Sequence, residues 1–194
     1  MTAATGALLF DTELGECGIA WSERGIVGVN LPETQPGQTL ERLRRRHGLR
    51  ESGHPPPAVQ QAVLGIVGLL RGERIEFHDA PLDLEGVPAM HQRVYAIARA
   101  IPPGATCTYG EIAARLGDSQ LARAVGQALA RNPIPIIVPC HRVLAAGGRS
   151  GGFSGGLGVS TKLRLLAIEG AALEAQHDLF SDGNVHQHQA DTPH

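Results

Sequence analysis

A stretch that contains two prolines, residues 79–88, divides the sequence into two parts with different patterns of apolar residues. Before it, short apolar or alternating runs are separated by turn residues, which is typical of antiparallel strands; the runs are ALLF, CGIAW and GIVGVNL within residues 7–31. After it, apolar residues recur at helical spacing. We therefore predict an α/β N-terminal domain over residues 1–86, a mainly α-helical domain over residues 87–171, and a flexible tail over residues 172–194.

The first part also contains two predicted helices. Residues 39–47 (TLERLRRRH) form a short helix with a basic surface. Residues 58–72 form an apolar helix that begins after three consecutive prolines. Residues 74–78 are predicted as a further strand, because two apolar residues alternate with polar ones there.

The second part contains four predicted helices, over residues 89–101, 110–116, 120–131 and 160–168. A short turn at Gly117 joins the second helix to the third, which is typical of a helix-turn-helix, here winged-helix-like. Leu121 and Val125 share one face of the third helix, and Arg123 lies about 160–200° around the helix from them. Arg123 is therefore expected to point into solvent.

The charge of the chain is unevenly distributed, although its net value is only −2. Residues 89–170 carry nine Lys and Arg against three acidic residues, a balance of +6. Residues 1–88 and residues 171–194 each have a balance of −4. A basic block between acidic flanks fits the binding of a polyanion by the second part of the protein, although solvated charged faces are also common.

A cysteine beside a histidine is the strongest sign of chemistry in the sequence. The short apolar run IPIIV at 134–138 leads through Pro139 into Cys140 and His141, so that a thiol at the end of a buried segment is a candidate nucleophile. Neighbouring residues of an extended chain point to opposite sides, and we expect a water bridge between the two. Cys17 and Cys107 are expected to be buried apolar residues, and the spacing predicts neither a disulfide framework nor a metal site.

Several motifs of the second part occur together in one order. They are IPPG at 101–104, TYGEIA at 108–113, RAVGQAL at 123–129, NP at 132–133, PCHRV at 139–143, FSGG at 153–156 and LLAIEG at 165–170. In content, order and spacing this set resembles the O6-alkylguanine-DNA alkyltransferases, also called methylated-DNA–protein-cysteine methyltransferases. The resemblance covers about residues 87–171, and it implies a ribonuclease-H-like fold for the N-terminal α/β domain.

The resemblance implies a catalytic role for four residues. Cys140 would accept the alkyl group, and His141 would take its proton through a water molecule. Glu169 would orient His141, and Asn132 would hold the cysteine segment in place. A free thiol with a pKa of about 8.5 is only a few per cent ionised at neutral pH, so the cysteine needs such a base.

Four further residues would bind DNA or the damaged base. Tyr109 would help to rotate the nucleotide and would donate a hydrogen bond to the guanine ring. Arg123 would fill the gap that the flipped base leaves in the stack, and Ser154 and the backbone around Val143 would touch the base. Extrusion is needed because sulfur cannot reach the alkyl carbon inside a stacked duplex.

These roles imply a protein that reacts once, without a cofactor or a metal, on double-stranded DNA that contains O6-alkylguanine, with O4-alkylthymine as a further candidate substrate. No run of about 18 apolar residues occurs, and the N-terminus lacks the basic residues of a signal peptide. We therefore expect a cytoplasmic protein that acts at the nucleoid, without a membrane or an obligate protein partner, and as a monomer.

Three other functions fit parts of the pattern. An alkyltransferase-like protein binds alkylated guanine without repairing it, but such proteins typically replace the cysteine that Cys140 provides here. A helix-turn-helix regulator would carry varied polar residues on its recognition helix, whereas Arg123 and Gln127 stand among small residues. A cysteine hydrolase built on Cys140, His141 and Glu169 would need an oxyanion hole, for which the sequence shows no clear sign.

Overall fold

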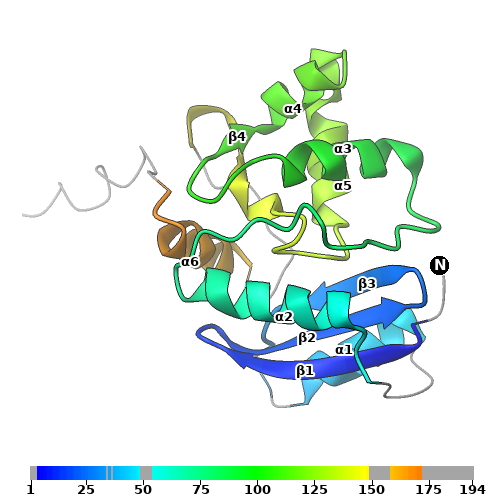
Figure 1. Ribbon diagram of the computed structural model, residues 1–194. Coiled ribbons are helices and arrows are strands. Elements are labelled where there is room, and N and C mark those ends of the chain that lie inside the picture. The colour runs from blue at the N-terminus through cyan, green and yellow to red at the C-terminus, as the bar shows by residue number, and fades with distance from the viewer. Residues whose placement is uncertain (1–3, 34, 36, 49–53, 149–157, 172–194) are drawn as a thin grey trace, which may run out of the picture.

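The computed structural model describes the chain except for residues 1–3, 34, 36, 49–53, 149–157 and 172–194 (Figure 1). It contains an α/β N-terminal part and a mainly helical C-terminal part, as the sequence predicts. The tail predicted over residues 172–194 lies outside the described residues. Within the described residues, no helix is both long enough and apolar enough to cross a membrane.

The N-terminal part is a three-stranded antiparallel sheet with helices on its two faces. The strands are β1 (Gly6–Thr12), β2 (Gly15–Ser22) and β3 (Gly25–Asn30), in the order β1-β2-β3. Neighbouring residues of β2 point to opposite faces, so Ala20 packs with Leu43 of α1 (Gln38–His47) while Ile19 and Trp21 belong to the main core. On that core side lies α2 (Pro57–Leu70), which begins with a proline at its first turn (Figure 1).

The strand predicted over residues 74–78 is wrong, because this segment is irregular. Its two apolar side chains, Ile75 and Phe77, lie against α2 at Gly65, where the helix carries no side chain. Its backbone pairs with no strand in the described part of the chain. Arg99 instead donates hydrogen bonds from Nη2 to the carbonyl oxygens of Phe77 and His78, and to that of Ala80 just beyond the segment. Alternating apolar residues thus serve here to cover a helix.

The C-terminal part consists of short helices around two very short parallel strands. The helices that the sequence predicts are present as α3 (Ala89–Arg99), α4 (Tyr109–Arg115), α5 (Ala122–Ala130) and α6 (Val159–Ile168), and the start of the third one is a separate 3-10 turn, η1 (Ser119–Leu121). The strands are β4 (Cys107–Thr108) and β5 (Val143–Leu144). Two further 3-10 turns are η2 (Cys140–Arg142) and η3 (Ala146–Gly148).

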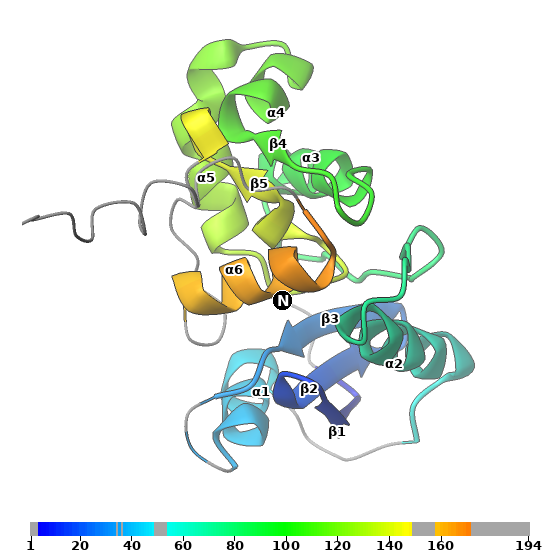
Figure 2. The same ribbon diagram turned by 90° about the vertical axis from the view of Figure 1, so that its left-hand side faces the viewer.

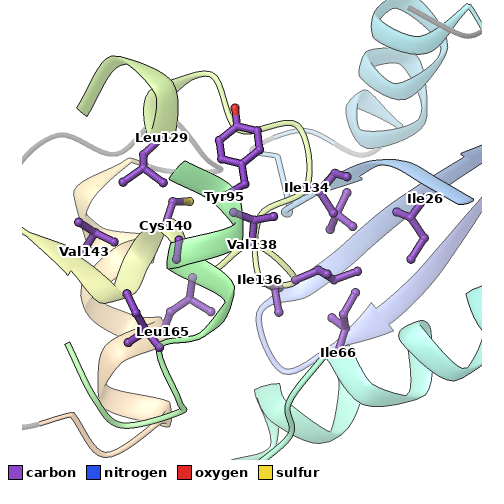
Figure 3. Close-up of a cluster of buried hydrophobic side chains, with 14 of the residues drawn as sticks. Ile26, Ile66, Tyr95, Leu129, Ile134, Ile136, Val138, Cys140, Val143 and Leu165 are labelled. Atoms are coloured by element: carbon purple, nitrogen blue, oxygen red, sulfur yellow. The ribbon is translucent and has the colours of Figure 1, made fainter. Parts of the chain in front are cut away.

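The apolar run after α5 joins the two parts of the molecule. Ile134, Ile136 and Val138 are completely buried and belong to the same core as Ile26 of β3 and Ile66 of α2 (Figure 3). The run is a tight turn, in which the Val138 amide donates to the Ile134 carbonyl oxygen at 2.9 Å. The Val29 amide of β3 donates to the carbonyl oxygen of Pro133 at 2.9 Å, so the sheet fixes the segment that carries Cys140.

Candidate active site

Cys140 begins the 3-10 turn η2, directly after the buried apolar run. Its side chain is buried, with 8% of the residue exposed, and its backbone amide donates to the Val138 carbonyl oxygen at 2.8 Å. Burial raises the pKa of the Cys140 thiol, while a hydrogen bond with Asn132 and the charge of Lys162 act to lower it. Burial has the larger effect, so the resting cysteine is a thiol and needs a base to become a nucleophile.

Next to Cys140, a buried ion-pair network is centred on Glu169 at the end of α6. His141 Nε2 lies 2.9 Å from Glu169 Oε1, and both side chains are almost completely buried. Arg142 donates from Nη2 to Oε1 at 2.8 Å and from Nε to Oε2 at 2.9 Å. The hydrogen bonds and charges of these two partners lower the pKa of Glu169 to about 2 despite its burial, so its carboxylate is ionised.

His141 is poised to accept a proton on its other ring nitrogen. The Nε2 hydrogen bond to the Glu169 carboxylate assigns the ring proton to Nε2 and leaves Nδ1 as the acceptor. In the described part of the chain, Nδ1 of His141 is buried and has no hydrogen-bond partner. Burial lowers the pKa of His141 and keeps the ring neutral at pH 7, which a proton acceptor requires.

Asn132 lies in the turn between α5 and the buried run, and its amide connects the two ends of that run. Its Nδ2 donates to the Val138 carbonyl oxygen at 2.8 Å, and its Oδ1 accepts from the Ile134 amide at 3.0 Å. The residue is buried, with 7% exposed. It therefore holds the turn that presents Cys140, and its side chain acts to lower the pKa of the thiol.

Tyr109 is brought to the site by the pairing of the two short strands. Register pairs Cys107 with Val143 and Thr108 with Leu144, so that the first residue of α4 follows directly. The ring of Tyr109 lies near Gly126 of α5, and burial raises the pKa of its hydroxyl, which remains a hydrogen-bond donor. Val143 is completely buried.

Two residues of the site are missed by the sequence analysis. Arg142 belongs to the PCHRV motif, but no role is predicted for it from the sequence. In the structure its guanidinium group forms an ion pair with the Glu169 carboxylate. Lys162, the single lysine of the sequence, is completely buried in α6 and donates from Nζ to the Val143 carbonyl oxygen at 2.6 Å. Burial lowers the pKa of Lys162 to about 8. Lys162 lies three residues before Leu165 and four residues before Leu166, so it shares the apolar face of the helix with them. A charged residue on an apolar face is the sequence signal by which Lys162 could have been found.

Of the remaining two predicted residues, the structure describes Arg123, which lies apart from this cluster. Arg123 is exposed on α5, on the side away from buried Val125 and Leu129, as predicted. Ser154 lies outside the described residues. Figure 2 shows α6, whose last residue directly precedes Glu169, between the helices of the C-terminal part and the sheet.

Comparison with known proteins identifies the family. Residues 89–171 match the domain described as the DNA-binding domain of 6-O-methylguanine DNA methyltransferase. The methylated-DNA–protein-cysteine methyltransferase of Methanothermobacter thermautotrophicus is 35% identical over 161 residues, which cover 83% of either chain. The chain belongs to the methylated-DNA–protein-cysteine methyltransferase family. Its function is the transfer of an alkyl group from DNA to a cysteine of its own, which is the activity of this family.

Other relatives agree with this assignment. The enzyme of the same name from Mycobacterium bovis is 44% identical over 125 residues, which cover 64% of this chain and 73% of that protein. Among solved structures, that of Mycobacterium tuberculosis OGT in complex with DNA superposes with a TM-score of 0.68 at 35% identity. The superposition covers 85% of this chain and 93% of that one, so it includes both parts of the molecule.

Proposed function

We propose that this methyltransferase repairs O6-alkylguanine in double-stranded DNA, and that Cys140 accepts the alkyl group. The observation that carries the proposal is the buried thiol beside a neutral histidine. An ionised carboxylate orients this histidine, and its Nδ1 has no partner among the residues that the structure describes. The family assignment identifies the reaction, and this geometry supports the roles of Cys140, His141 and Glu169 in it.

The reaction begins with the removal of the thiol proton. It passes from Cys140 Sγ through a bridging water molecule to Nδ1 of His141. The resulting imidazolium is stabilised by the Glu169 carboxylate on Nε2, and Arg142 keeps that carboxylate ionised and in place. The nearby charge of Lys162 favours the thiolate.

The thiolate then attacks the alkyl carbon in line with its bond to O6. The bond between sulfur and carbon forms as the bond between carbon and O6 breaks, and the electron pair goes to the guanine ring. The Tyr109 hydroxyl stabilises the departing guanine anion by a hydrogen bond. A proton from water then gives neutral guanine, and His141 returns the thiol proton to water, so that no net proton is consumed. The thioether is not a leaving group, so each protein molecule reacts once.

Recognition of the lesion is assigned to the C-terminal part. We infer that α4 and α5 form a helix-turn-helix, that Arg123 enters the base stack, and that the backbone at Val143 and Ser154 contacts the flipped base. Support comes from the exposure of Arg123 on a helix whose other face is buried. The sheet of the N-terminal part, with helices on its two faces, supports a ribonuclease-H-like domain. O4-alkylthymine is a further candidate substrate.

The test is the intact mass of the protein after mixing with an O6-methylguanine oligonucleotide, followed by peptide mapping. We expect a single gain of about 14 Da on the Cys140 peptide, saturating at one equivalent. A Cys140→Ala variant should bind the same duplex without gaining mass. Full transfer activity in that variant would refute the role of Cys140, and lesion binding without transfer in the wild-type protein would favour the alkyltransferase-like alternative.

A further inference from the structure

A groove of about 490 Å³ lies on the N-terminal part, between α2 and residues 73–80. Ala62 and Gly65 line it from α2, and half-buried Ile75 and Phe77 line it from the segment that follows the helix. None of the described residues that line this α2 groove belongs to the proposed active site. The groove can therefore serve a purpose separate from alkyl transfer.

The outer face of α2 lacks the charged residues that usually cover a surface helix. The sequence of α2 contains no Asp, Glu, Lys or Arg. Leu64, which lines the α2 groove, is 71% exposed and is the most exposed large apolar residue in the described part of the chain. An exposed leucine beside an apolar groove is typical of a surface that another apolar surface covers.

Carboxylates give the α2 groove an acidic rim. Three exposed acidic residues line it: Glu73, Glu76 and Asp79. No lysine or arginine lines the groove or forms an ion pair with these carboxylates within the described ranges, and Glu76 contacts exposed His78. Two arginines near the segment, Arg74 and Arg99, donate hydrogen bonds to main-chain carbonyl oxygens. The rim therefore attracts positive charge.

The dimensions of the α2 groove fit a helix better than a small molecule. Its lining on α2 runs from Ala58 to Gly65, which is about 10 Å or two helical turns. A helix docked along it would place apolar residues at i, i+3 or i+4, and i+7 on the groove. Lysine or arginine residues beside that stripe would lie opposite the acidic rim.

Two segments of this chain fit the α2 groove poorly. Residues 171–194 carry four acidic residues and no lysine or arginine, so their charge has the same sign as that of the rim. A second copy could offer the exposed Arg44 and Arg45 of α1, but Leu43 of that helix is completely buried and Leu40 is half-buried. Neither segment combines basic residues with an exposed apolar stripe, so a different protein is the better occupant.

We propose that the α2 groove binds an amphipathic helix of a partner protein, which places apolar residues on Leu64 and Phe77 and basic residues on the acidic rim. This gives the N-terminal part a role in protein recruitment, which goes beyond alkyl transfer. The helices α4 and α5, to which the DNA contacts are assigned, lie at the other end of the molecule (Figure 1). An acidic rim also repels DNA, so the groove stays accessible to the partner during repair.

The test uses a model helix as the probe and the full chain as the protein. The probe is a fluorescein-labelled synthetic peptide of two repeats of Leu-Lys-Lys-Leu-Leu-Lys-Leu, which has leucines on one face and lysines on the other. A second peptide with glutamate in place of every lysine has the same apolar face and the opposite charge. Fluorescence anisotropy measures the Kd as the protein is titrated into each peptide.

Four variants separate the apolar contact from the charge. Leu64→Gln removes the exposed apolar residue, and its control is Val159→Thr, at the other large apolar residue that is exposed. The double variant Glu73→Gln with Glu76→Gln removes two charges from the rim. Its control, Glu23→Gln with Glu41→Gln, removes two exposed carboxylates from outside the groove, so the net charge changes equally. Thermal unfolding checks that each variant is folded.

We expect the lysine peptide to bind the wild type with a Kd of the order of 10 µM, and the glutamate peptide to bind at least tenfold more weakly. The Kd should rise about tenfold in Leu64→Gln and about threefold to tenfold in the double variant of the rim. Both controls should stay within about twofold of the wild type. Transfer from an O6-methylguanine duplex should be unchanged in Leu64→Gln, because that residue lies outside the proposed active site.

Three outcomes would overturn the inference. One is the absence of saturable binding of the lysine peptide to the wild type. Another is an equal loss of binding in each variant and its control, which would show that only the overall charge of the protein attracts the peptide. The third is self-association of the wild type in sedimentation velocity that Leu64→Gln abolishes, since the groove would then be occupied by a second copy of this chain.

Discussion

At the scale of single residues, the site depends on one carboxylate, Glu169, that is bonded to one cation and to one neutral imidazole. Glu169 is buried and accepts hydrogen bonds from His141 and Arg142. Two charges of opposite sign offset each other's burial, but removal of one leaves the other uncompensated in an apolar environment. The proposed catalytic geometry and the stability of the C-terminal part therefore depend on the same side chain.

The Glu169→Gln substitution should destabilise the protein and stop alkyl transfer. It leaves the buried guanidinium of Arg142 without a counter-charge, for which we expect a loss of about 3–5 kcal/mol in the free energy of unfolding. Urea denaturation measures this loss. The Glu73→Gln variant, which changes an exposed carboxylate, serves as the control. Equal free energies of unfolding of the two variants would contradict this prediction.

The low pKa of Glu169 also predicts acid sensitivity. A carboxylate whose pKa falls from 4.5 to about 2 on folding contributes stability that is present above its unfolded pKa and is lost as the pH falls through about 2. Between these values the wild-type protein should lose stability more steeply than Glu169→Gln, which has no proton to bind at this position. Parallel slopes in urea titrations from pH 5 to pH 2 would contradict this prediction.

Lys162 should control the reactivity of Cys140. Replacing it with Met removes a positive charge near the sulfur and the donor to the Val143 carbonyl oxygen, so the pKa of the thiol should rise further. We expect alkylation of Cys140 by iodoacetamide to slow about threefold to tenfold at pH 7.5, and its pH profile to move to higher pH. Arg164→Met, in an exposed residue of the same helix, should leave the profile in place.

At the scale of elements, α5 has one buried face and one exposed face. Val125, Ala128 and Leu129 are buried, whereas Arg123 and Gln127 are exposed. This pattern follows from helical periodicity, which is why the exposure of Arg123 could be predicted from the sequence. The role proposed for Arg123 in DNA, by contrast, rests on the resemblance of the whole motif set.

Arg123→Ala should therefore slow repair in DNA without affecting the chemical step. We expect transfer from an O6-methylguanine duplex to fall by about tenfold or more, because the extruded base loses the side chain that fills its place. Transfer from free O6-benzylguanine should change by less than about twofold, since no base stack is opened. Equal losses with both substrates would remove this role from Arg123.

The end of α1 contains a second acid-sensitive group. His47 is buried against Gly28 of β3, its Nε2 has no partner among the described residues, and burial lowers its pKa to about 4. The unfolded chain binds a proton at this residue below its ordinary pKa of 6.5, whereas the folded protein does so only near 4. The free energy of unfolding should therefore fall by about 3 kcal/mol as the pH drops through this window.

His47→Leu should flatten that dependence between pH 7 and pH 4. Urea denaturation across the window measures the effect, and His54→Leu, in an exposed histidine, is the matched control. A wild-type slope in His47→Leu would show that other groups, such as His141, account for the acid sensitivity.

At the scale of the whole molecule, local patterns predicted most elements but not the contacts between distant segments. The three strands of the sheet and the helices α1 to α6 follow from alternation, helical spacing, prolines and glycines close to each other in the chain. Arg142 and Lys162 were missed because their roles depend on Glu169 and Val143, which are neighbours only in the fold. Residues 74–78 were assigned wrongly because alternation cannot distinguish a strand from a segment that packs on a helix.

Arg99 links this segment to the C-terminal part, so its loss should loosen the connection between the two parts. Arg99→Met removes the donor from three carbonyl oxygens, and we expect the free energy of unfolding to fall by about 2 kcal/mol. Limited proteolysis should become faster within residues 74–80. Arg93→Met on the same helix, whose single carbonyl contact is exposed, should retain the wild-type cleavage rate.

The burial of Lys162 has a practical consequence for labelling the protein. It is the single lysine among 194 residues, and it is completely buried in the folded protein. Reagents that acylate lysine side chains would therefore find no exposed target on the folded protein. A lysine acylated only after unfolding would make this residue a built-in reporter of global opening, readable by mass spectrometry without any engineered probe.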